Sequence, residues 1–564
     1  MKIPWQLIFV VVALAIGGFA PRLGDRFFGP IERLGARLAR RKRLSICVVI
    51  LATALIRVAL LSLYPVPIPE QHDEFSYLLA GDTFAHGRLT NPPHPMWIYF
   101  ETFHVNQHPT YMSKYPPAQG AFLALGEVLG NPWIGVLISA ALMCGAILWM
   151  LQGWLPPEWA LLGGVLAVLR VGVFSYWMNS YWGGAAAAIG GALVVGALPR
   201  IMRFHRARDA VLLALGAAIL ANSRPFEGLV FCVPVAIALV VWMCGRRSPA
   251  WRKTAARIIL PAFAVLAATV VFMGYYNWRG TGHASLFPYV LNSRTYMSQP
   301  DFAWETGKAP LHYLNPQFEA FYNGWCRKTA FAGRANSIPQ AWRVIRSDVS
   351  DFGGFFLWPD LCVPLLALPW IVTDRRVRFL VYQFAFCFFA FFLVVWFQPH
   401  YAAPLTATTF ALLTQGFRHI RRWTFRARPV GIGAVRAAVF CVALLAPFHT
   451  SFSDLQFAFE YRARIAAQLN AMPGDQLVIV RYSPLHLPIV EWVYNRADID
   501  RAKVVWAREI PGVSMQPLLD YFHGRHVWMV DPDRAPHLVP YAPSAGSLNG
   551  PRGGTKMLAA GATR

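Results

Sequence analysis

The sequence is dominated by a long series of apolar runs, each about as long as a helix must be to cross a lipid bilayer. The candidate spans are residues 4–20, 44–64, 132–151, 158–175, 183–199, 210–223, 227–244, 258–276, 354–371, 379–396, 400–417 and 433–449. A bilayer core takes roughly 20 apolar residues per helix, and open irregular backbone is excluded from it. We therefore expect an all-α polytopic membrane domain with about twelve transmembrane helices.

Composition and charge agree with this class. Hydrophobic residues make up 56% of the chain and charged residues only 14%, whereas soluble domains carry roughly 25% charged residues. The net charge is +24, but the basic residues gather in short connections that follow alternate apolar runs. This is the positive-inside pattern. A nucleic-acid-binding protein would need a basic face on a folded domain, so we expect no nucleic-acid partner.

The charge pattern predicts which segments face outward. Residues 1–43 are expected to form an anchor helix and a basic cytoplasmic segment, and residues 44–449 a transmembrane domain. The long segments 65–131 and 277–353 and the region from residue 450 onward fall on the opposite side of the membrane. These segments are rich in proline and aromatic residues, as irregular extramembrane loops are.

The C-terminal region predicts a second, smaller fold. Gln476–Tyr482, Lys503–Ala507 and His526–Val530 are typical of short buried strands, and Ile489–Tyr494 and Met515–Phe522 of helices between them. Such alternation favours a small extracytoplasmic α/β domain with a parallel sheet over residues 450–533. No glycine-rich phosphate loop opens its helices. Residues 534–564 are rich in proline, glycine and alanine, and we expect a disordered tail.

The first outward segment is acidic within a basic protein. Asp73 and Glu74 lie a few residues beyond an apolar run and at the start of an apparent amphipathic helix, Phe75–Ala85. A solvated surface is the usual explanation of such a pair. Its position near the headgroup layer instead favours a base that reaches a lipid-linked substrate.

Arginines inside apolar runs give a second signal. Arg57, Arg170 and Arg224 all lie toward the outer ends of their spans, where the positive-inside rule disfavours them. Charges at such depth usually face a cavity or a partner, and arginine suits bidentate phosphate contact. The alternatives are snorkelling to lipid phosphates or pairing with Glu127 and Glu227.

His400 and Tyr401 lie at another outer span end. Aromatic residues there are normally part of the interfacial belt, and a lone histidine is more often structural than catalytic. Both residues are candidates to line an outward-facing site.

The ordered motifs resemble those of the GT-C superfamily of membrane glycosyltransferases. The nearest branch contains the protein O-mannosyltransferases, the lipid A aminoarabinose transferases and the rhizobial lipid A sugar transferases. The matching stretches are Asp73-Glu74 within HDEFSYLLAGDTFAHGRL, Lys114 within SKYPPAQGAFLALG, and His400-Tyr401-Ala402-Ala403-Pro404. The resemblance covers roughly residues 44–417.

The resemblance implies a bacterial inner-membrane enzyme whose active site faces the periplasm and which acts in the cell envelope. A polyprenyl-phosphate-linked sugar would be the donor, and a lipid, glycan or protein the acceptor. Asp73 would act as base or orient the acceptor, Glu74 would support it, and Lys114, Arg224 and Tyr401 would bind the donor phosphate. Ser113 stands where the aminoarabinose branch has glutamate, and Tyr115 is inserted after Lys114. A divalent metal ion is left open.

Two rival functions remain at the level of sequence. A transporter or flippase of lipid-linked saccharides would show inverted repeats and broken helices at the bilayer midplane, whereas this chain concentrates its polar residues at one membrane face. A non-catalytic envelope assembly protein would leave the acidic loop and the outer arginines unexplained.

Overall fold

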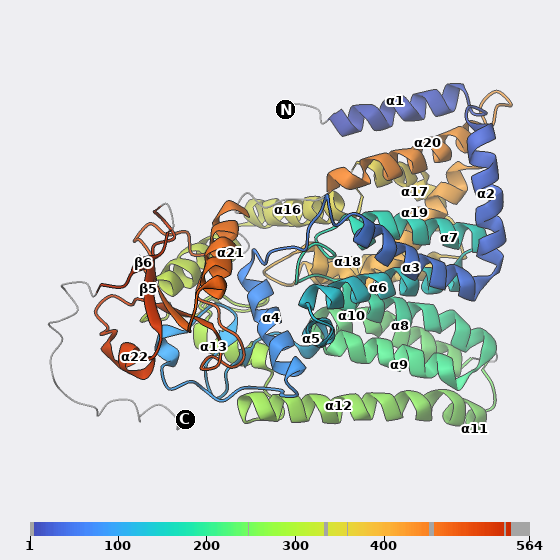
Figure 1. Ribbon diagram of the computed structural model, residues 1–564. Coiled ribbons are helices and arrows are strands. Elements are labelled where there is room, and N and C mark those ends of the chain that lie inside the picture. Colours follow the sequence, from blue (N-terminus) through green and yellow to red (C-terminus); the bar gives the residue numbers. More distant parts are fainter. Residues whose placement is uncertain are drawn as a thin grey trace.

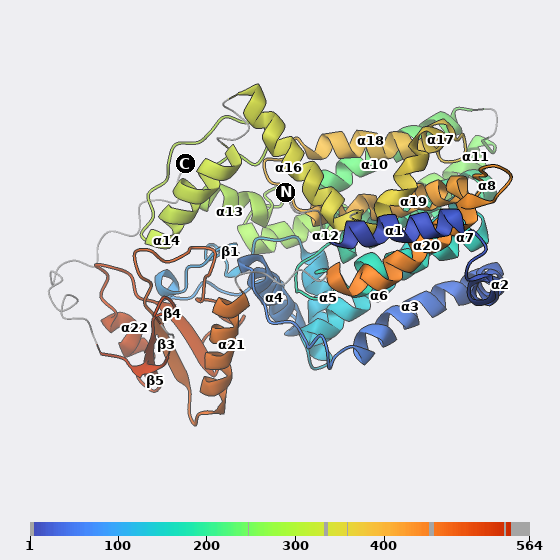
Figure 2. The same ribbon diagram turned by 90° about the horizontal axis from the view of Figure 1, so that it is seen from above.

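The protein consists of a helical bundle and a smaller sheet-containing part at one end of it (Figure 1). The structure, a computed structural model, describes residues 5–245, 248–331, 337–357, 359–449, 456–534 and 537–542. Most helices of the bundle run nearly parallel, and the four-stranded sheet lies beyond their ends in both views (Figures 1 and 2). The fold is mostly helical, as expected.

Helices occupy every apolar run that the sequence singled out. The bundle elements are α1 (Trp5–Phe19), α2 (Asp25–Arg40), α3 (Lys42–Ala59), α6 (Pro132–Trp154), α7 (Pro157–Ala167), η2 (Val168–Val173), α8 (Ala185–Phe204), α9 (Ala207–Ala221), α10 (Pro225–Met243), α11 (Trp251–Thr254), η3 (Ala255–Ile259), α12 (Leu260–Thr281), α16 (Ile338–Phe356), η5 (Asp360–Ala367), α17 (Leu368–Thr373), α18 (Arg378–Phe391), η6 (Pro399–Leu405), α19 (Thr406–Ile420), α20 (Val430–Leu445) and η7 (Ala446–His449).

The number of about twelve spans is not confirmed. Within the described residues, five helices are long and apolar enough to cross a membrane, and six if the pair α16 and η5–α17, bent by 107°, counts as one span. Several expected spans are shorter or broken. α1 has 15 residues and α18 has 14, α7 passes into the π-helical η2, and the 3-10 segment η6 precedes α19. The protein is an integral membrane protein by these helices, and its orientation stays a prediction.

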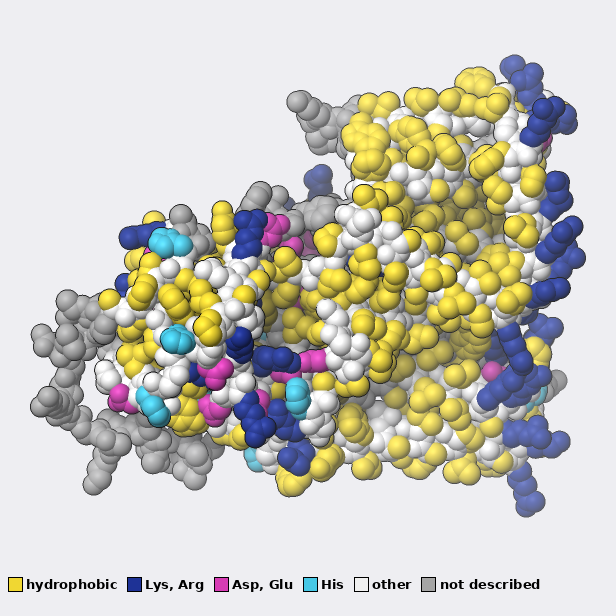
Figure 3. All heavy atoms as spheres, in the orientation of Figure 1, with side chains coloured by type: hydrophobic (Ala, Val, Ile, Leu, Met, Phe, Trp, Pro, Cys, Tyr) yellow, Lys and Arg dark blue, Asp and Glu magenta, His cyan; other side chains and the backbone are white. Residues whose placement is uncertain are grey.

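The charged surface divides as the sequence pattern indicated. Lysine and arginine side chains line the edge of the bundle farthest from the sheet, and a broad hydrophobic surface separates this edge from the sheet-containing end (Figure 3). Basic and non-basic connections thus lie at opposite ends of the bundle. The positive-inside rule would place the basic edge in the cytoplasm.

The first outer segment contains the helices α4 (His72–Ala85) and α5 (Pro117–Val128), η1 (Trp97–Tyr99) and a hairpin of β1 (Val105–Asn106) and β2 (Met112–Ser113). α4 and α5 pack at close range, because a Cβ added at Gly120 would lie 2.7 Å from Ala80 Cβ. α4 is buried on nearly all sides. The helix expected at Phe75–Ala85 is present, but its expected amphipathic character is wrong, since both α5 and the C-terminal region cover it.

The second outer segment contains α13 (Pro288–Tyr296), α14 (Pro316–Phe318) and the π-helical η4 (Glu319–Phe331) before α16 begins. Phe321 of η4 packs against His72, with 5.3 Å between ring centroids. This segment therefore covers one side of α4.

The C-terminal sheet has the order β4-β3-β5-β6 and forms from the three stretches expected to be strands. β3 (Gln476–Val480) pairs in parallel with both β4 (Val504–Arg508) and β5 (His526–Val530), and α21 (Gln456–Ala471) and α22 (Gln516–Tyr521) accompany the sheet. The helix expected at Ile489–Tyr494 is wrong, because this stretch is irregular although most of it is buried. The domain boundaries stay predictions.

A part of residues 534–564, which were expected to form a disordered tail, belongs to the sheet. β6 (Val539–Pro540) pairs antiparallel with β5, so a part of the chain beyond residue 534 completes the sheet. Residues 543–564 lie outside the described residues.

The C-terminal sheet region is fastened to the first outer segment by stacking and by charge. Tyr494 stacks on Phe75 of α4 with 4.2 Å between ring centroids. Arg496 forms ion pairs with Asp82 at 2.9 Å and with Glu127. α4 thus lies between the bundle and the sheet, and its first residues open the candidate site.

Candidate functional site

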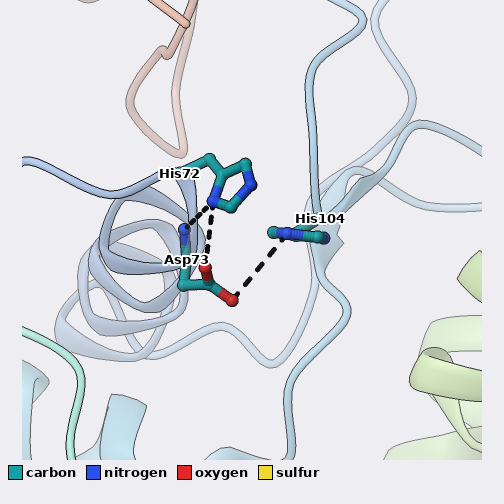
Figure 4. Close-up of side chains that lie close together, drawn as sticks. All are labelled: His72, Asp73 and His104. Carbon is teal, nitrogen blue, oxygen red and sulfur yellow. Dashed lines mark hydrogen bonds and ion pairs between the residues drawn. The ribbon is translucent and has the colours of Figure 1, made fainter. Parts of the chain in front are cut away.

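Asp73 is the centre of a compact polar cluster at the start of α4. Its Oδ2 lies 2.9 Å from His72 Nδ1 and its Oδ1 lies 3.8 Å from His104 Nε2, and the hydroxyl of Tyr115 donates to Oδ1. His72 and Asp73 come from α4, whereas His104 comes from the facing segment before β1, and the three side chains point toward one another (Figure 4). Asp73 is therefore held by partners from two separate segments.

The surroundings of Asp73 keep it ionised. Burial alone would raise the pKa of this carboxyl, but His104, His72 and Lys114 hold it well below its usual range. Burial, with Lys114 and His72, lowers the pKa of His104 well below its usual value, while Asp73 acts to raise it. The low pKa of Asp73 favours the carboxylate form, which can accept a hydrogen bond from a substrate hydroxyl.

The His72–Asp73–His104 cluster also fits a divalent metal ion. The three ligand atoms lie within 4.8 Å of one another, and nitrogen and carboxylate oxygen are ligands that zinc accepts. The Asp73 backbone N–H donates to His72 Nδ1 at 3.1 Å, so this nitrogen cannot also donate to the nearby carboxylate oxygen. Two acceptors so close together repel each other unless a proton or a cation lies between them.

Tyr115, the residue inserted after Lys114, connects the anion to a cation. Its hydroxyl contacts Asp73, and the Lys114 ammonium lies 5.2 Å from the centroid of its ring. The ring of Tyr289, from α13, lies on another side of Lys114 at 4.9 Å. The insertion therefore does not remove Lys114 from the site, and it supplies one of the two rings that hold the ammonium.

Lys114 is buried and lacks a counter-ion. Across the described ranges, no carboxylate lies within 4.0 Å of its ammonium. Burial lowers the pKa of Lys114 to about 8, while Asp73 and Asp301 act to raise it. The ammonium is thus mostly charged at neutral pH, and it is available to an anionic ligand.

A partly open cavity lies beside Lys114. Its lining combines polar side chains of the outer segments with the outer ends of α9 and α12, and includes Lys114, Asn222, Met273, Tyr276, Asn277 and Tyr289. Few residues in the apolar part of the span Trp251–Thr281, which contains α12, are fully buried, and the buried residues of α12 gather at its end near the cavity. A ligand in this cavity would have its polar end at Lys114 and its apolar end toward the lipid-facing side of α12.

Arg224 and Tyr401 form a second part of the same site. The guanidinium of Arg224, just before α10, lies 4.2 Å from the ring centroid of Tyr401. Arg224 is half-buried and makes no ion pair with any described residue within 4.0 Å. The charge of Arg224 contributes, after burial, to lowering the pKa of Lys114, so Arg224 lies near the Lys114 ammonium.

His400 belongs to an aromatic cluster next to Tyr401. Its Nδ1 lies 2.8 Å from the hydroxyl of Tyr176, and its ring centroid lies 4.7 Å from that of Trp182. The side chain is buried. These contacts favour a packing role for His400, which supports the wall behind Tyr401.

Glu74 points away from Asp73 and holds backbone. Its Oε1 accepts from the backbone N–H of Glu70 and of Gln71, both at 3.0 Å, and its Oε2 accepts from that of Tyr181 at 2.8 Å. Burial raises the pKa of Glu74 to about 7 despite these donors. This arrangement is a capping box that ties the start of α4 to the segment after η2. Glu74 as a catalytic residue stays a prediction that this geometry does not favour.

Arg57 lies near the site, and its guanidinium is hydrogen-bonded to other parts of the chain. It donates to Asn179 Oδ1 at 3.0 Å and to the carbonyl oxygens of Tyr64 at 2.8 Å and Pro65 at 3.1 Å. Its guanidinium also lies over Trp133 at 4.7 Å. Three of its five N–H donors are thus bonded within the chain. This geometry favours a role of Arg57 in fixing the end of α3, and its part in phosphate binding stays a prediction.

Arg170 is also engaged, deep between helices. It donates to the carbonyl oxygens of Phe355 at 2.7 Å and Gly354 at 2.6 Å, and it pairs with Asp360 at 3.4 Å. Its role is to join η2 to α16 and η5. The alternative foreseen for both arginines, pairing with Glu127 or Glu227, is not observed in the described chain, where other partners take their place.

The sequence did not predict several residues of the site. His72 and His104 were visible as histidines of an acidic segment, but nothing in their spacing of 32 positions brings them together. Tyr115 was taken as an interruption, and Tyr289 lies in another outer segment. The adjacent histidine and aspartate at 72 and 73 were the one local signal for a shared ligand.

The comparisons with known proteins give distant structural similarities. No protein-family model matches the sequence, and no curated protein matches it. The structure is similar to an Archaeoglobus fulgidus oligosaccharyltransferase tethered to an acceptor peptide, with 12% identity, a TM-score of 0.42, and coverage of 78% of this chain and 62% of that one. It is also similar to ArnT from Cupriavidus metallidurans bound to undecaprenyl phosphate, with 13% identity, a TM-score of 0.48, and coverage of 86% and 92%.

The chain spans less than two thirds of the length of the oligosaccharyltransferase. At such identities and TM-scores, the likeness carries no argument about activity. What the chain shows by itself is a site in which the charges of Asp73 and Arg224 act on Lys114.

Proposed function

We propose that the protein is a membrane glycosyltransferase that moves a sugar from a polyprenyl-phosphate donor to an acceptor on the periplasmic side of the inner membrane. The single observation that carries the proposal is that a largely buried carboxylate, Asp73, and a buried ammonium, Lys114, both contact Tyr115, while no described carboxylate lies within 4.0 Å of the ammonium. Sugar transfer from a phosphate needs both charges, one for the entering hydroxyl and one for the leaving phosphate.

The reaction follows from these two charges. The acceptor oxygen attacks the anomeric carbon, the bond between this carbon and the donor phosphate oxygen breaks, and polyprenyl phosphate leaves with the bonding electrons. Asp73 accepts a hydrogen bond from the acceptor hydroxyl and takes its proton as the new bond forms. Lys114 compensates the charge that grows on the phosphate, and Arg224 contacts the same group from the α10 side.

Tyr115 has a positioning role in this scheme. Burial and the nearby Asp73 raise the pKa of Tyr115 well above its usual value, so its hydroxyl stays protonated and donates to Asp73. That hydrogen bond keeps Oδ1 in place, while Oδ2 lies beside His72. Glu74 would support the site by fixing the start of α4.

The donor's lipid tail also has a fitting surface. The cavity beside Lys114 is lined by Met273 and Tyr276 of α12 and by Ala221 at the end of α9. A polyprenyl chain would extend from the phosphate along the exposed apolar face of α12. The acceptor would enter from the side of the C-terminal sheet, which covers α4 through Tyr494.

A divalent metal ion, if bound, would be held by His72, Asp73 and His104. It would supply positive charge that orients the acceptor and withdraws electron density from its hydroxyl. The transfer chemistry described above is assigned to the side chains of this chain.

The proposal is tested with purified protein in proteoliposomes and a panel of radiolabelled polyprenyl-phosphate sugars. Asp73→Asn keeps the size of the side chain and removes its charge, and we expect transfer to fall about 10²–10⁴-fold. Asp498→Asn, at an exposed position of the C-terminal region, is the matched control. Transfer by Asp73→Asn at the wild-type rate would remove Asp73 from the mechanism. The absence of transfer by wild type from every donor would refute the enzyme.

A further inference from the structure

The helix α2 lies across the direction of the membrane-spanning helices. It runs crosswise to α6, α8 and α12 in Figure 1 and is seen end-on in Figure 2. α2 connects α1 to α3 at the basic edge of the bundle, and Gly24, with φ of 79°, makes the turn into it. A helix so placed lies parallel to the membrane plane, at the level where the apolar spans end.

One side of α2 is fixed to the bundle by ion pairs. Glu32 pairs with Arg421 at the end of α19 and with Arg436 of α20, both at 3.0 Å. Asp25 contacts the same Arg436. Ala39, on this side, is buried. The rotation of α2 about its own axis is therefore set, and its remaining two sides point in defined directions.

The second side of α2 is an apolar stripe without cover. Leu23, Phe27, Ile31 and Leu34 are between 53% and 68% exposed, and at 3.6 residues per turn the three within the helix lie about 120° from the bundle-facing side. Exposed apolar side chains of α1 and α3, such as Ile16 and Leu51, lie on the helices that α2 connects. The stripe belongs with the hydrophobic surface that the membrane covers.

The third side of α2 is basic. Arg26, Arg33, Arg37 and Arg40 lie on it, again about 120° from the other two sides. All four are exposed, and none has an ion pair within the part of the chain that the structure describes. The acidic residues of α2 are thus used against the bundle, and its arginines are left for an outside anion.

We propose that α2 is an interfacial helix that binds the phosphate headgroups of anionic phospholipids. The apolar stripe would enter the acyl region, and the four arginines would contact phosphates at the membrane surface, where each adds attraction to anionic lipid. A protein partner would have to cover an apolar stripe that the bilayer already reaches. The chemistry instead fits a surface that offers hydrocarbon and phosphate side by side.

The test uses the full-length protein in vesicles of phosphatidylcholine with one quarter phosphatidylglycerol. The protein is extracted in mild detergent, and the lipids that stay bound are quantified by mass spectrometry. The variant R26Q/R33Q/R37Q/R40Q is compared with wild type. The control R294Q/K308Q/R501Q/R534Q removes the same number of exposed charges from outer parts of the chain.

Wild type and the control are expected to be enriched in phosphatidylglycerol relative to the vesicles, and the α2 variant to lose at least about half of the enrichment. A benzophenone amino acid at position 34 is expected to crosslink to acyl chains, whereas the same probe at position 37 is not. Equal enrichment in the α2 variant and wild type would overturn the proposal. So would crosslinking of position 34 to protein alone.

Discussion

Two pairs of buried or half-buried cations near the outer end of the bundle differ in what surrounds them. Arg57 and Arg170 spend their donors on carbonyl oxygens, an amide oxygen and Asp360. Lys114 and Arg224 are flanked by aromatic rings and have no carboxylate within 4.0 Å in the described chain. We expect the first pair to stabilise the fold and, under the proposed function, the second pair to bind an anionic ligand.

Burial of a charged side chain is therefore not by itself a sign of a ligand-binding site. Burying an ion is costly unless partners satisfy it. A buried cation that is hydrogen-bonded within the chain is explained by the elements that it joins. A buried cation that is flanked only by aromatic rings needs another explanation. Substitution of Arg57 or Arg170 should therefore lower mainly stability, whereas substitution of Lys114 or Arg224 should lower mainly activity.

The largest expected effect is the loss of stability in Arg170→Met. This change leaves Asp360 buried without its arginine and removes two hydrogen bonds, so the free energy of unfolding should fall by about 3–5 kcal/mol. Denaturant unfolding followed in detergent micelles measures it. The double variant Arg170→Met/Asp360→Asn should recover part of the loss. A stable Arg170→Met that no longer binds donor would reverse the comparison.

Lys114→Met should act on activity and leave stability intact. Loss of the cation opposite the leaving phosphate should reduce sugar transfer by about 10²–10³-fold. The free energy of unfolding should stay the same or increase, because a buried ammonium without counter-ion is removed. Transfer rates and unfolding curves are measured on one preparation, with the exposed Lys308→Met as control. A marked loss of stability would assign Lys114 to the fold instead.

Arg57→Lys tests whether Arg57 acts on stability and not on activity. Lysine keeps the charge but cannot reproduce the three donor directions to Asn179, Tyr64 and Pro65. We expect a loss of about 1–3 kcal/mol in unfolding free energy, with transfer per folded molecule unchanged. If transfer instead fell while the protein stayed stable, Arg57 would belong with Lys114.

The smallest effect is expected for Arg224→Gln. Loss of one charged contact to the phosphate should raise the donor KM about tenfold. Stability should fall by no more than about 1 kcal/mol, the usual value of a cation–π contact such as that with Tyr401. Tyr401→Phe, which keeps the ring under Arg224, is the control and should stay close to wild type in both measurements.

The sequence predicted the membrane class, the side on which the basic connections gather and the three parallel strands, because each depends on local periodicity or composition. It proposed Asp73 and Lys114 from family-like motifs and Arg224 from its place at the outer end of an apolar run, and their roles stay predictions. It could not separate these from Arg57 and Arg170, because satisfaction of a cation depends on carbonyl groups such as Phe355, 185 positions away from Arg170. Nor could it foresee Tyr115 as a bridge, since stacking on Tyr77 depends on tertiary packing.

The most direct test of the comparison is the affinity of the folded protein for polyprenyl phosphate without a sugar, measured by titration calorimetry in nanodiscs. We predict that Lys114→Met weakens the binding of polyprenyl phosphate at least about tenfold, the effect of one lost charged contact. Arg57→Lys should bind it like wild type. Binding unchanged by Lys114→Met, together with weaker binding by Arg57→Lys, would contradict the assignment of the phosphate site.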